Sequence, residues 1–256
     1  IWCLFYDTWN IVIGRWRMDS KIIKYFIVLI LINFKSYAVE FQGKFIQGHF
    51  IIGKTEPGTE ISIDKKKIKV SKDGYFAFGL DKDRKFDVLI SEGEKKIIKK
   101  VKKRKYKIQR IDGLPEKKVT PPKEFYERIK KENKLISNAR EVDSDLSFFK
   151  DQFIIPVDDA IITGVYGSQR ILNGIPKWPH YGLDFAQKKG SPVKAMNNGV
   201  VTLAEKDLFY TGATLIFDHG HGISTLYMHL DDIFVDIGDH VKKGDIIGTV
   251  GATGRA

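Results

Sequence analysis

The sequence is poor in cysteine. Its 256 residues include a single one, Cys3, which lies at the N-terminal end. A chain with one cysteine can form no internal disulfide, so its fold must be held by packing alone. A metal site further along the chain has no thiolate available and must use histidine and carboxylate ligands.

Long apolar runs are also absent. The longest, from Tyr25 to Phe34, is too short to cross a bilayer comfortably, because a spanning helix needs about 20 apolar residues. It follows two lysines and precedes the small residues Ser36 and Ala38. This order is typical of a secretory signal peptide over residues 18–38, cleaved after Ala38. We therefore expect a periplasmic or cell-envelope protein that contacts the membrane only through this segment, if it stays uncleaved.

A methionine at the first position is missing as well. The chain begins with Ile1, and its first methionine is Met18. Residues 1–17 fit no targeting pattern. We interpret residues 1–17 as an upstream extension that is not translated in the native protein.

Acidic residues are outnumbered by basic ones. The chain has 32 Asp and Glu against 43 Lys and Arg, a formal net charge of +11. Such a charge favours an anionic partner, for example nucleic acid, lipid headgroups or a cell-wall polymer. Because export removes a protein from nucleic acid, we expect no nucleic-acid partner.

The patterning predicts a mainly β protein. Residues 39–110 contain short alternating segments separated by turns, which predict a small β-sandwich, with residues 41–52 as its first strand. Residues 111–152 are predicted to be a linker and an amphipathic helix. Thr120 is expected to cap this helix, with Pro121 and Pro122 as its first residues. Its apolar positions recur every three or four residues from Phe125 to Phe149.

Residues 153–256 change in character. They are rich in glycine and contain short β-like runs with no long helical pattern between them. We expect an all-β domain here, which would be the C-terminal half of the fold.

Five of the six histidines lie in this second half, and two candidate ligands are His180 and Asp184. A fully extended strand would separate the two by roughly 13 Å, too far to bind one ion. The chain is therefore expected to bend at Gly182, next to Pro179 in the same segment. Imidazole nitrogen and carboxylate oxygen are both good zinc ligands. A structural hydrogen bond between the two side chains is an equally good interpretation of this spacing.

His229 lies near the end of a predicted strand over residues 225–230. Alternation places Leu226, Met228 and Leu230 on one face and His229 on the other. The ring is therefore expected to line a cleft as a proton-transfer group, or to meet solvent.

The remaining histidines of this half are weaker candidates. His219 and His221 alternate with Gly220 and Gly222, a pattern typical of a hairpin turn, so we do not expect them to bind metal. His240 precedes a short strand and is expected to be exposed.

Seven motifs in this half resemble those of the lysostaphin/LytM-type zinc metallopeptidases. They include His-Tyr-Gly-Leu-Asp at 180–184 and Tyr-Met-His-Leu at 227–230. The resemblance covers residues 153–256. The signal peptide, the β-rich first domain and residues 109–115 are similar to exported members from Gram-negative bacteria. The seven motifs lie at 180–186, 190–195, 199–201, 218–222, 227–230, 241–245 and 251–255.

The resemblance implies a LytM domain that acts as a peptidoglycan endopeptidase, a murein hydrolase. Such enzymes hydrolyse the peptide cross-links of the cell wall with a zinc-activated water. His180 and Asp184 are implied to bind Zn2+, and His229 is implied to be catalytic by stabilising the developing oxyanion. The implied partners are peptidoglycan peptide stems, cut around D-alanine and diaminopimelate in Gram-negative relatives.

One departure from the family pattern lies at the C-terminal end. The family continues into a His-x-His motif, whose second histidine is the third zinc ligand, and this chain ends at Ala256, short of it. Catalytic zinc sites normally have three protein ligands, so we expect the chain as written to be a truncated, inactive piece of a metallopeptidase. The alternative is a non-catalytic LytM-type regulator that activates cell-wall amidases. The presence of His180, Asp184 and His229 together argues against it.

Overall fold

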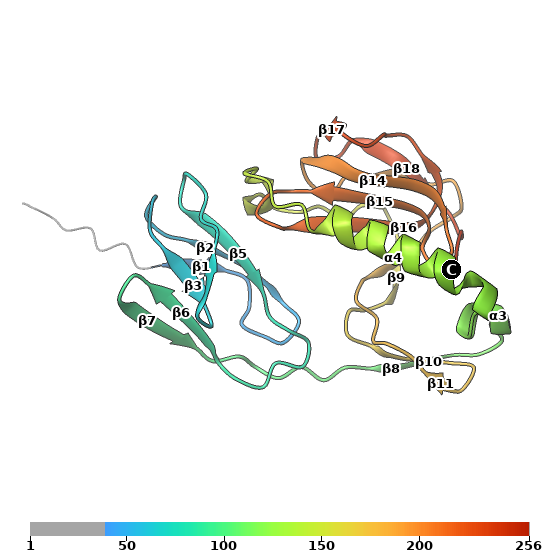
Figure 1. Cartoon of the computed structure of the whole chain (residues 1–256), viewed down its shortest axis with the longest axis horizontal. Coiled ribbons are helices and arrows are strands. Elements are labelled where there is room, and N and C mark those ends of the chain that lie inside the picture. Colours follow the sequence, from blue (N-terminus) through green and yellow to red (C-terminus); the bar gives the residue numbers. More distant parts are fainter. Residues whose placement is uncertain (1–38, 256) are drawn as a thin grey trace, which may run out of the picture. The chain divides into compact units, whose positions relative to one another are not determined.

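A computed structural model describes residues 39–255 of the chain. The interpretations of residues 1–17 and 18–38 lie outside the described residues. Strands dominate these residues, and within them one helix, α4 (Tyr126–Arg140), is longer than a single turn (Figure 1). The prediction of a mainly β fold with a connecting helix is confirmed. Between residues 39 and 255, no helix combines the length and apolar character needed to cross a membrane.

Two small antiparallel sheets make up the N-terminal part. Alternate residues of both sheets point into one shared core, which includes Ile51 and Phe76 from one sheet and Ile61 and Ile90 from the other. This is the predicted β-sandwich. The first sheet has the order β1 (Glu40–Gln42), β2 (Phe50–Lys54), β5 (Tyr75–Gly79), and the second the order β4 (Lys66–Ile68), β3 (Ile61–Ile63), β6 (Val88–Glu92), β7 (Lys95–Lys99).

The first predicted strand, over residues 41–52, is wrong in one respect. The chain forms two strands, β1 and β2, which pair with each other as neighbours in the sheet. Gly43 and Gly48 between them adopt φ values of +111° and +76°, which glycine adopts readily and other residues rarely adopt. A reversal of the chain therefore replaces a continuous strand.

The segment between the two halves contains four short elements besides α4. They are β8 (Ile108–Ile111), α3 (Glu116–Val119) and the 3-10 turns η1 (Lys123–Phe125) and η2 (Phe148–Lys150). The predicted helix start is wrong. Thr120 is the C-cap of α3, where its N–H donates to the Glu116 carbonyl, and α4 begins only at Tyr126. A proline disfavours the helical conformation in the residue before it, so two consecutive prolines keep this stretch extended.

The predicted helix also ends too late. α4 stops at Arg140, and the apolar series beyond it, from Val142 to Phe149, is not helical. The residues that follow the helix are Glu-Val-Asp-Ser-Asp, whose short polar side chains compete with helical hydrogen bonding. Lys69 accordingly donates to the carbonyl oxygens of Asp143 and Ser144 at 3.1 and 3.2 Å, which holds this stretch outside the helix.

A six-stranded antiparallel sheet forms the centre of the C-terminal half, as the all-β prediction required. One face of the sheet carries a core that includes Val201, Leu215 and Phe217. The strand order is β13 (Pro192–Lys194), β18 (Ile246–Val250), β16 (Ser224–Ile233), β15 (Gly212–Asp218), β14 (Gly199–Leu208), β17 (His240–Val241).

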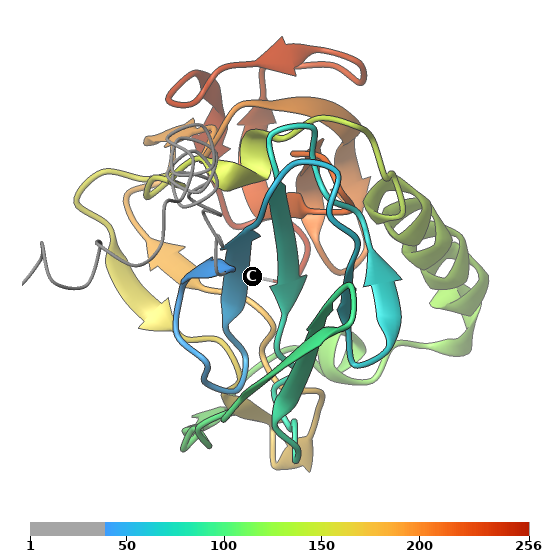
Figure 2. The same cartoon turned by 90° about the vertical axis from the view of Figure 1, so that its left-hand side faces the viewer.

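Helix α4 covers part of the other face of this sheet, as the views in Figures 1 and 2 agree. Ala139 of the helix packs with Leu203 and Ile216 of the sheet, and Ile136 lies against this cluster. Every residue of β15 is buried, because one face meets the main core and the other meets α4. A strand that is covered on both faces has a nearly continuous apolar sequence, and β15 has one.

Two smaller sheets lie beside the large one and carry the candidate site. β9 (Ile161–Gly164) pairs with β12 (Asp184–Ala186) in an antiparallel ladder. β10 (Gln169–Leu172) lies between β11 (Ile175–Pro176) and β8, and its pairing with β8 is parallel. Residues 109 and 170 are thereby placed opposite each other, which becomes important at the site.

Candidate functional site

The chain bends at Gly182 between the two predicted ligands. His180 Nε2 and Asp184 Oδ1 lie 3.0 Å apart, and Asp184 begins strand β12. An extended chain would hold the two residues roughly 13 Å apart. The bend expected from the sequence is therefore present, and it brings an imidazole nitrogen and a carboxylate oxygen together.

The backbone around His180 is held on both sides. Its N–H donates to the Ser168 carbonyl at 2.8 Å, and its carbonyl accepts from the Gly167 N–H at 2.6 Å. The side chain is 8% exposed, and its Nδ1 is buried with no hydrogen-bond partner. A buried ring nitrogen of this kind is usually satisfied by water, an ion or a polar group, and the other ring nitrogen, Nε2, is the one that faces Asp184.

The Asp184 carboxylate has two different partners. One oxygen faces His180, and the other forms an ion pair with the guanidinium of Arg170 from β10. Gly164 lies opposite Asp184 in the β9–β12 ladder, and a Cβ there would collide with the carboxylate. Burial alone would raise the pKa of Asp184, but His180 and Arg170 together hold it below its ordinary value of 3.8. The group is therefore an anion near neutral pH.

His229 lies in a bulge of β16. Four residues of β16, from Tyr227 to Leu230, are matched against three of β15, from Leu215 to Ala213, and His229 has a φ of +62°. The alternation expected from the sequence is therefore wrong. Tyr227 and Leu230 both enter the main core, whereas Met228 is exposed. The bulge re-aims the side chains that follow it, as bulges next to functional sites often do.

The ring of His229 has one nitrogen engaged. Nδ1 lies 2.8 Å from the Thr253 carbonyl, which can only accept, so Nδ1 carries the proton and Nε2 is left as an acceptor. Burial lowers the pKa of His229 below 6.5, while the Asp184 carboxylate acts in the opposite direction. The ring is thus a neutral base near pH 7, electrostatically coupled to the predicted metal ligand. The residue is half-buried, and its place in a cleft stays a prediction.

Residues that sequence reasoning missed hold this arrangement in place. Arg170, Gly164 and Thr253 are each distant in sequence from the group that they contact. Thr253 Oγ1 also accepts from the Ala213 N–H at 2.9 Å and donates to the Leu230 carbonyl at 2.7 Å. Only the motif at 251–255 gave a signal for Thr253, and none pointed to the other two.

The histidines set aside as weak candidates are placed elsewhere. His219 is fully buried, with Nδ1 2.6 Å from the Asn198 carbonyl and Nε2 2.8 Å from Thr225 Oγ1. It belongs to the turn between β15 and β16, where its role is structural. His221 lies in the same turn, 4.9 Å from the ring of Phe149. His240 is exposed on β17.

The two donor groups present, an imidazole and a carboxylate, are of the kinds that bind zinc. Imidazole nitrogen and carboxylate oxygen converge at His180 and Asp184, and both atom types bind zinc. Among residues 39–255, however, no group of three or more His, Cys, Asp or Glu side chains gathers in a form that could hold a metal. The described residues thus supply two ligands of a possible centre.

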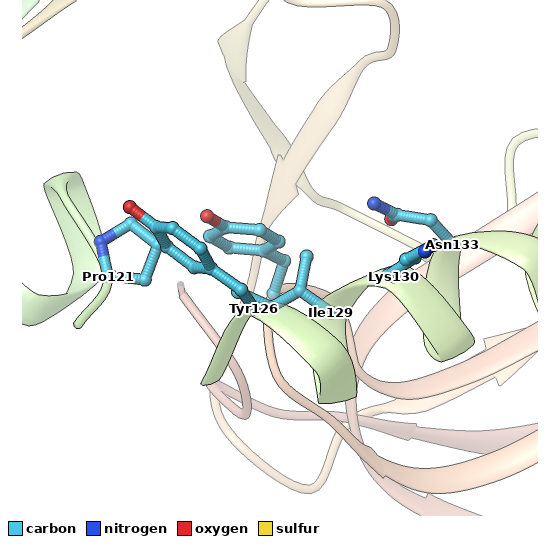
Figure 3. A pocket seen from close by; sticks show the side chains of 6 residues that line it. Pro121, Tyr126, Ile129, Lys130 and Asn133 are labelled. Carbon is cyan, nitrogen blue, oxygen red and sulfur yellow. The ribbon is translucent and has the colours of Figure 1, made fainter. Parts of the chain in front are cut away.

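A separate hollow lies beside the start of α4 and contains none of the predicted site residues. Its volume is about 340 Å³, and Figure 3 shows Tyr126 and Ile129 reaching into it. Tyr210, which also lines it, accepts the Arg255 N–H at its carbonyl oxygen, 2.9 Å away. The other lining residues are Pro121, Lys130 and Asn133.

Known proteins match the C-terminal part of this chain. Residues 178–256 match the profile of Peptidase family M23. Peptidoglycan DD-endopeptidase ShyB of Vibrio cholerae is 43% identical over 77 residues, which are 30% of this chain and 18% of ShyB. DD-carboxypeptidase/endopeptidase Mpg of Neisseria meningitidis is 40% identical over 77 residues, which are 30% of this chain and 17% of Mpg. The chain thus spans under a fifth of the length of these relatives.

A solved structure extends the likeness beyond the matched segment. A putative peptidase M23 from Pseudomonas aeruginosa is 24% identical, with a TM-score of 0.60 over 83% of this chain and 85% of that one. At this identity the likeness concerns the fold, and it includes the N-terminal sandwich. The sequence matches and the fold agree: residues 178–256 match Peptidase family M23 and resemble a LytM-type peptidase domain.

Proposed function

We propose that this protein is a peptidoglycan DD-endopeptidase that hydrolyses the peptide cross-links of the cell wall. The observation that carries the proposal is the convergence of His180 and Asp184, 3.0 Å apart, with the neutral His229 ring coupled to the same carboxylate. The relatives ShyB and Mpg, named as peptidoglycan or DD-specific endopeptidases, support the substrate class.

Zinc is the metal that we propose for this site. His180 Nε2 and Asp184 Oδ1 would supply two of its ligands, since imidazole nitrogen and carboxylate oxygen both bind zinc. When bound in such a site, zinc polarises a peptide carbonyl and lowers the pKa of a water molecule. The lowered pKa of Asp184 keeps the carboxylate charged and ready to bind a cation.

The role proposed for His229 follows from its tautomer. Because Nδ1 is committed to the Thr253 carbonyl, Nε2 is the atom that can accept a proton or, once protonated, donate one. Burial keeps the ring neutral near pH 7, so it is in the form that a general base needs. Once protonated, the same nitrogen can stabilise negative charge that develops on the substrate oxygen.

The test uses the full-length protein and purified cross-linked muropeptides, with products resolved by liquid chromatography and mass spectrometry. We expect cleavage to disappear after chelation and to return with zinc. Asp184→Asn and His229→Asn should each lower the rate at least about 100-fold, because each removes a group that acts in the reaction. His240→Asn changes an exposed histidine of the same half and should leave the rate unchanged.

Intact cross-links after incubation with the zinc-loaded protein would rule out the endopeptidase. If that protein instead stimulated a separate cell-wall amidase, the regulator considered above would be the better description. The two outcomes are told apart by the products, since an amidase releases whole stem peptides and an endopeptidase cuts between them.

We also propose that the protein acts outside the cytoplasm, in the periplasm or cell envelope. Val39, the first residue after the predicted cleavage position, is 8% exposed and packs in the sandwich core. The sandwich core thus includes the residue that directly follows the predicted cleavage position. N-terminal sequencing of protein recovered from the periplasm should start at Val39, and protein confined to the cytoplasm would contradict the proposal.

A further inference from the structure

The second oxygen of Asp184 is held by a residue that no motif singled out. Oδ1 faces His180 Nε2 at 3.0 Å, and Oδ2 forms an ion pair with an Nη of Arg170. The two oxygens of the carboxylate therefore have separate tasks. We propose that Arg170 is a positioning residue, which occupies Oδ2 so that only Oδ1 is offered to the metal, on the side of His180.

Arg170 is itself held by the strand that connects the two halves of the chain. Its Nε donates to Gln109 Oε1 at 3.2 Å, and the two residues are register partners in the parallel β8–β10 ladder. The Arg170 carbonyl accepts from the Lys177 N–H at 2.9 Å, so the backbone is tied on the other side as well. The side chain is 25% exposed. A chain of contacts thus runs from Gln109 through Arg170 to Asp184.

The planar guanidinium group is what this geometry needs. It uses Nε for Gln109 and an Nη for Asp184 at the same time, from one rigid fork. A lysine would keep the positive charge but has a single nitrogen on a flexible stem, so it could not hold both partners in this way. Charge and orientation can therefore be separated by experiment.

The charge of Arg170 supports the same role. It lowers the pKa of Asp184 together with His180, which keeps the carboxylate anionic despite its burial. Groups that hydrogen-bond a ligating carboxylate orient it, and losing them typically weakens metal binding by about 10- to 100-fold.

The inference rests on the proposed zinc site, so its test measures zinc affinity directly. Zinc binding to the full-length protein would be followed by competition with a chromophoric chelator, for the wild type and for Arg170→Gln, Arg170→Lys and Gln109→Ala. We expect the dissociation constant to rise about 10- to 100-fold in Arg170→Gln. Arg170→Lys should regain only part of the loss, and Gln109→Ala should weaken binding by about threefold to tenfold, because Arg170 keeps its contact with Asp184.

The matched control is Arg128→Gln. Arg128 also forms ion pairs with carboxylates, those of Glu132 and Asp207, but at the contact between α4 and β14. Its zinc affinity should equal that of the wild type. The visible spectrum of the cobalt-substituted protein gives a second readout, which should change in the Arg170 variants and stay unchanged in the control.

The outcomes separate the inference from the function on which it rests. Zinc affinities within about twofold for the wild type, Arg170→Gln and Arg170→Lys would overturn the positioning role and leave the endopeptidase intact. A wild type that binds no zinc would overturn both. An Arg170→Lys variant that matches the wild type, beside a weakened Arg170→Gln, would show that charge alone is required and would overturn the orienting role.

Discussion

Gly164 and Asp184 face each other across the β9–β12 ladder, and the Asp184 carboxylate fills the space beside Gly164. Gly164→Ala would put a methyl group where the carboxylate lies and so displace a proposed zinc ligand. A displacement of about 1 Å at a reacting centre can lower a rate roughly 100-fold. We expect a loss of this order in kcat/KM on muropeptides, with zinc content reduced.

Gly79→Ala is the control for this substitution. Gly79 ends β5 in the other half of the chain, and a Cβ there would meet nothing within 4 Å. Its activity and zinc content should equal those of the wild type. A fully active Gly164→Ala protein with normal zinc content would show that the carboxylate need not lie where the structure puts it.

Three histidines of the C-terminal half have pKa values lowered chiefly by burial, namely His219, His221 and His229. Below about pH 6.5 the unfolded chain binds protons at these rings that the folded chain does not. The free energy of unfolding should therefore fall as the pH drops from 7 to 5. Asp184 affects stability in a different pH range. Its lowered pKa contributes stability that is lost only when the pH falls below 3.8, the ordinary pKa of the group.

Urea unfolding at several pH values checks this expectation. His219→Gln removes the most buried of the three rings and should make the unfolding free energy less dependent on pH, besides lowering it. An unfolding free energy that is constant or rises between pH 7 and 5 would contradict the lowered pKa values.

At the level of residues, sequence could predict the His180–Asp184 pair because both members lie within one short bend. It could not predict their supports. Gly164 faces Asp184 through strand pairing, and Arg170 reaches it by an ion pair from β10. Thr253 reaches His229 from 24 positions along the chain. Pairing of this kind depends on the register of several strands, which one sequence does not reveal.

At the level of elements, α4 has two different sides. Ile136 packs against the cluster formed with β14 and β15, whereas its neighbour Leu135 is 39% exposed. For a fully buried side chain, Ile136→Ala would lower the free energy of unfolding by about 2–5 kcal/mol. Because Ile136 is only partly buried, we expect about 1–2 kcal/mol. Leu135→Ala should change the free energy of unfolding by less than about 0.5 kcal/mol. Chemical unfolding of both variants measures the difference, and equal effects would mean that α4 does not pack on the sheet.

The periodicity of apolar residues does not indicate where a helix ends or where a strand bulges. The helical period predicted a helix but not its ends, because two prolines and a run of short polar residues act locally on the backbone. Strand alternation located β16 but misplaced Leu230, because a bulge adds one residue and moves Leu230 to the face of Tyr227. A pattern of apolar residues carries no direct signal of either event.

At the level of the whole molecule, positive charge is concentrated between residues 95 and 107. This stretch has lysine or arginine at nine positions and no acidic residue, and Lys96, Lys100 and Lys103 in it are exposed. Peptide stems of the proposed substrate carry carboxylates. Binding to purified sacculi, measured by co-sedimentation, should therefore fall at least about threefold between low and high salt.

The triple variant Lys96→Gln, Lys100→Gln, Lys103→Gln tests the source of this dependence. It should bind sacculi more weakly at low salt and respond less to added salt. Binding that ignores both salt and these lysines would mean that contacts at the peptidase domain alone hold the polymer.

The fold as a whole was more predictable than its connections. Short alternating runs and glycine-rich turns are sufficient to indicate a sandwich followed by an all-β domain. The parallel pairing of β8 with β10 joins residues about 60 positions apart, and no sequence pattern near Ile108 predicts this pairing. That pairing is also what links Gln109 to the site.

The left-handed backbone at His229 restricts which residues can ever stand there. A φ of +62° suits glycine and asparagine and, to a lesser degree, histidine and aspartate, but it is unfavourable for alanine and worse for β-branched residues. A relative of this domain that does not hydrolyse peptide bonds would be free of the proposed chemical requirement at this position and still restricted by the conformational one. We expect such relatives to carry asparagine or glycine here, so that the bulge is kept without the proposed reaction.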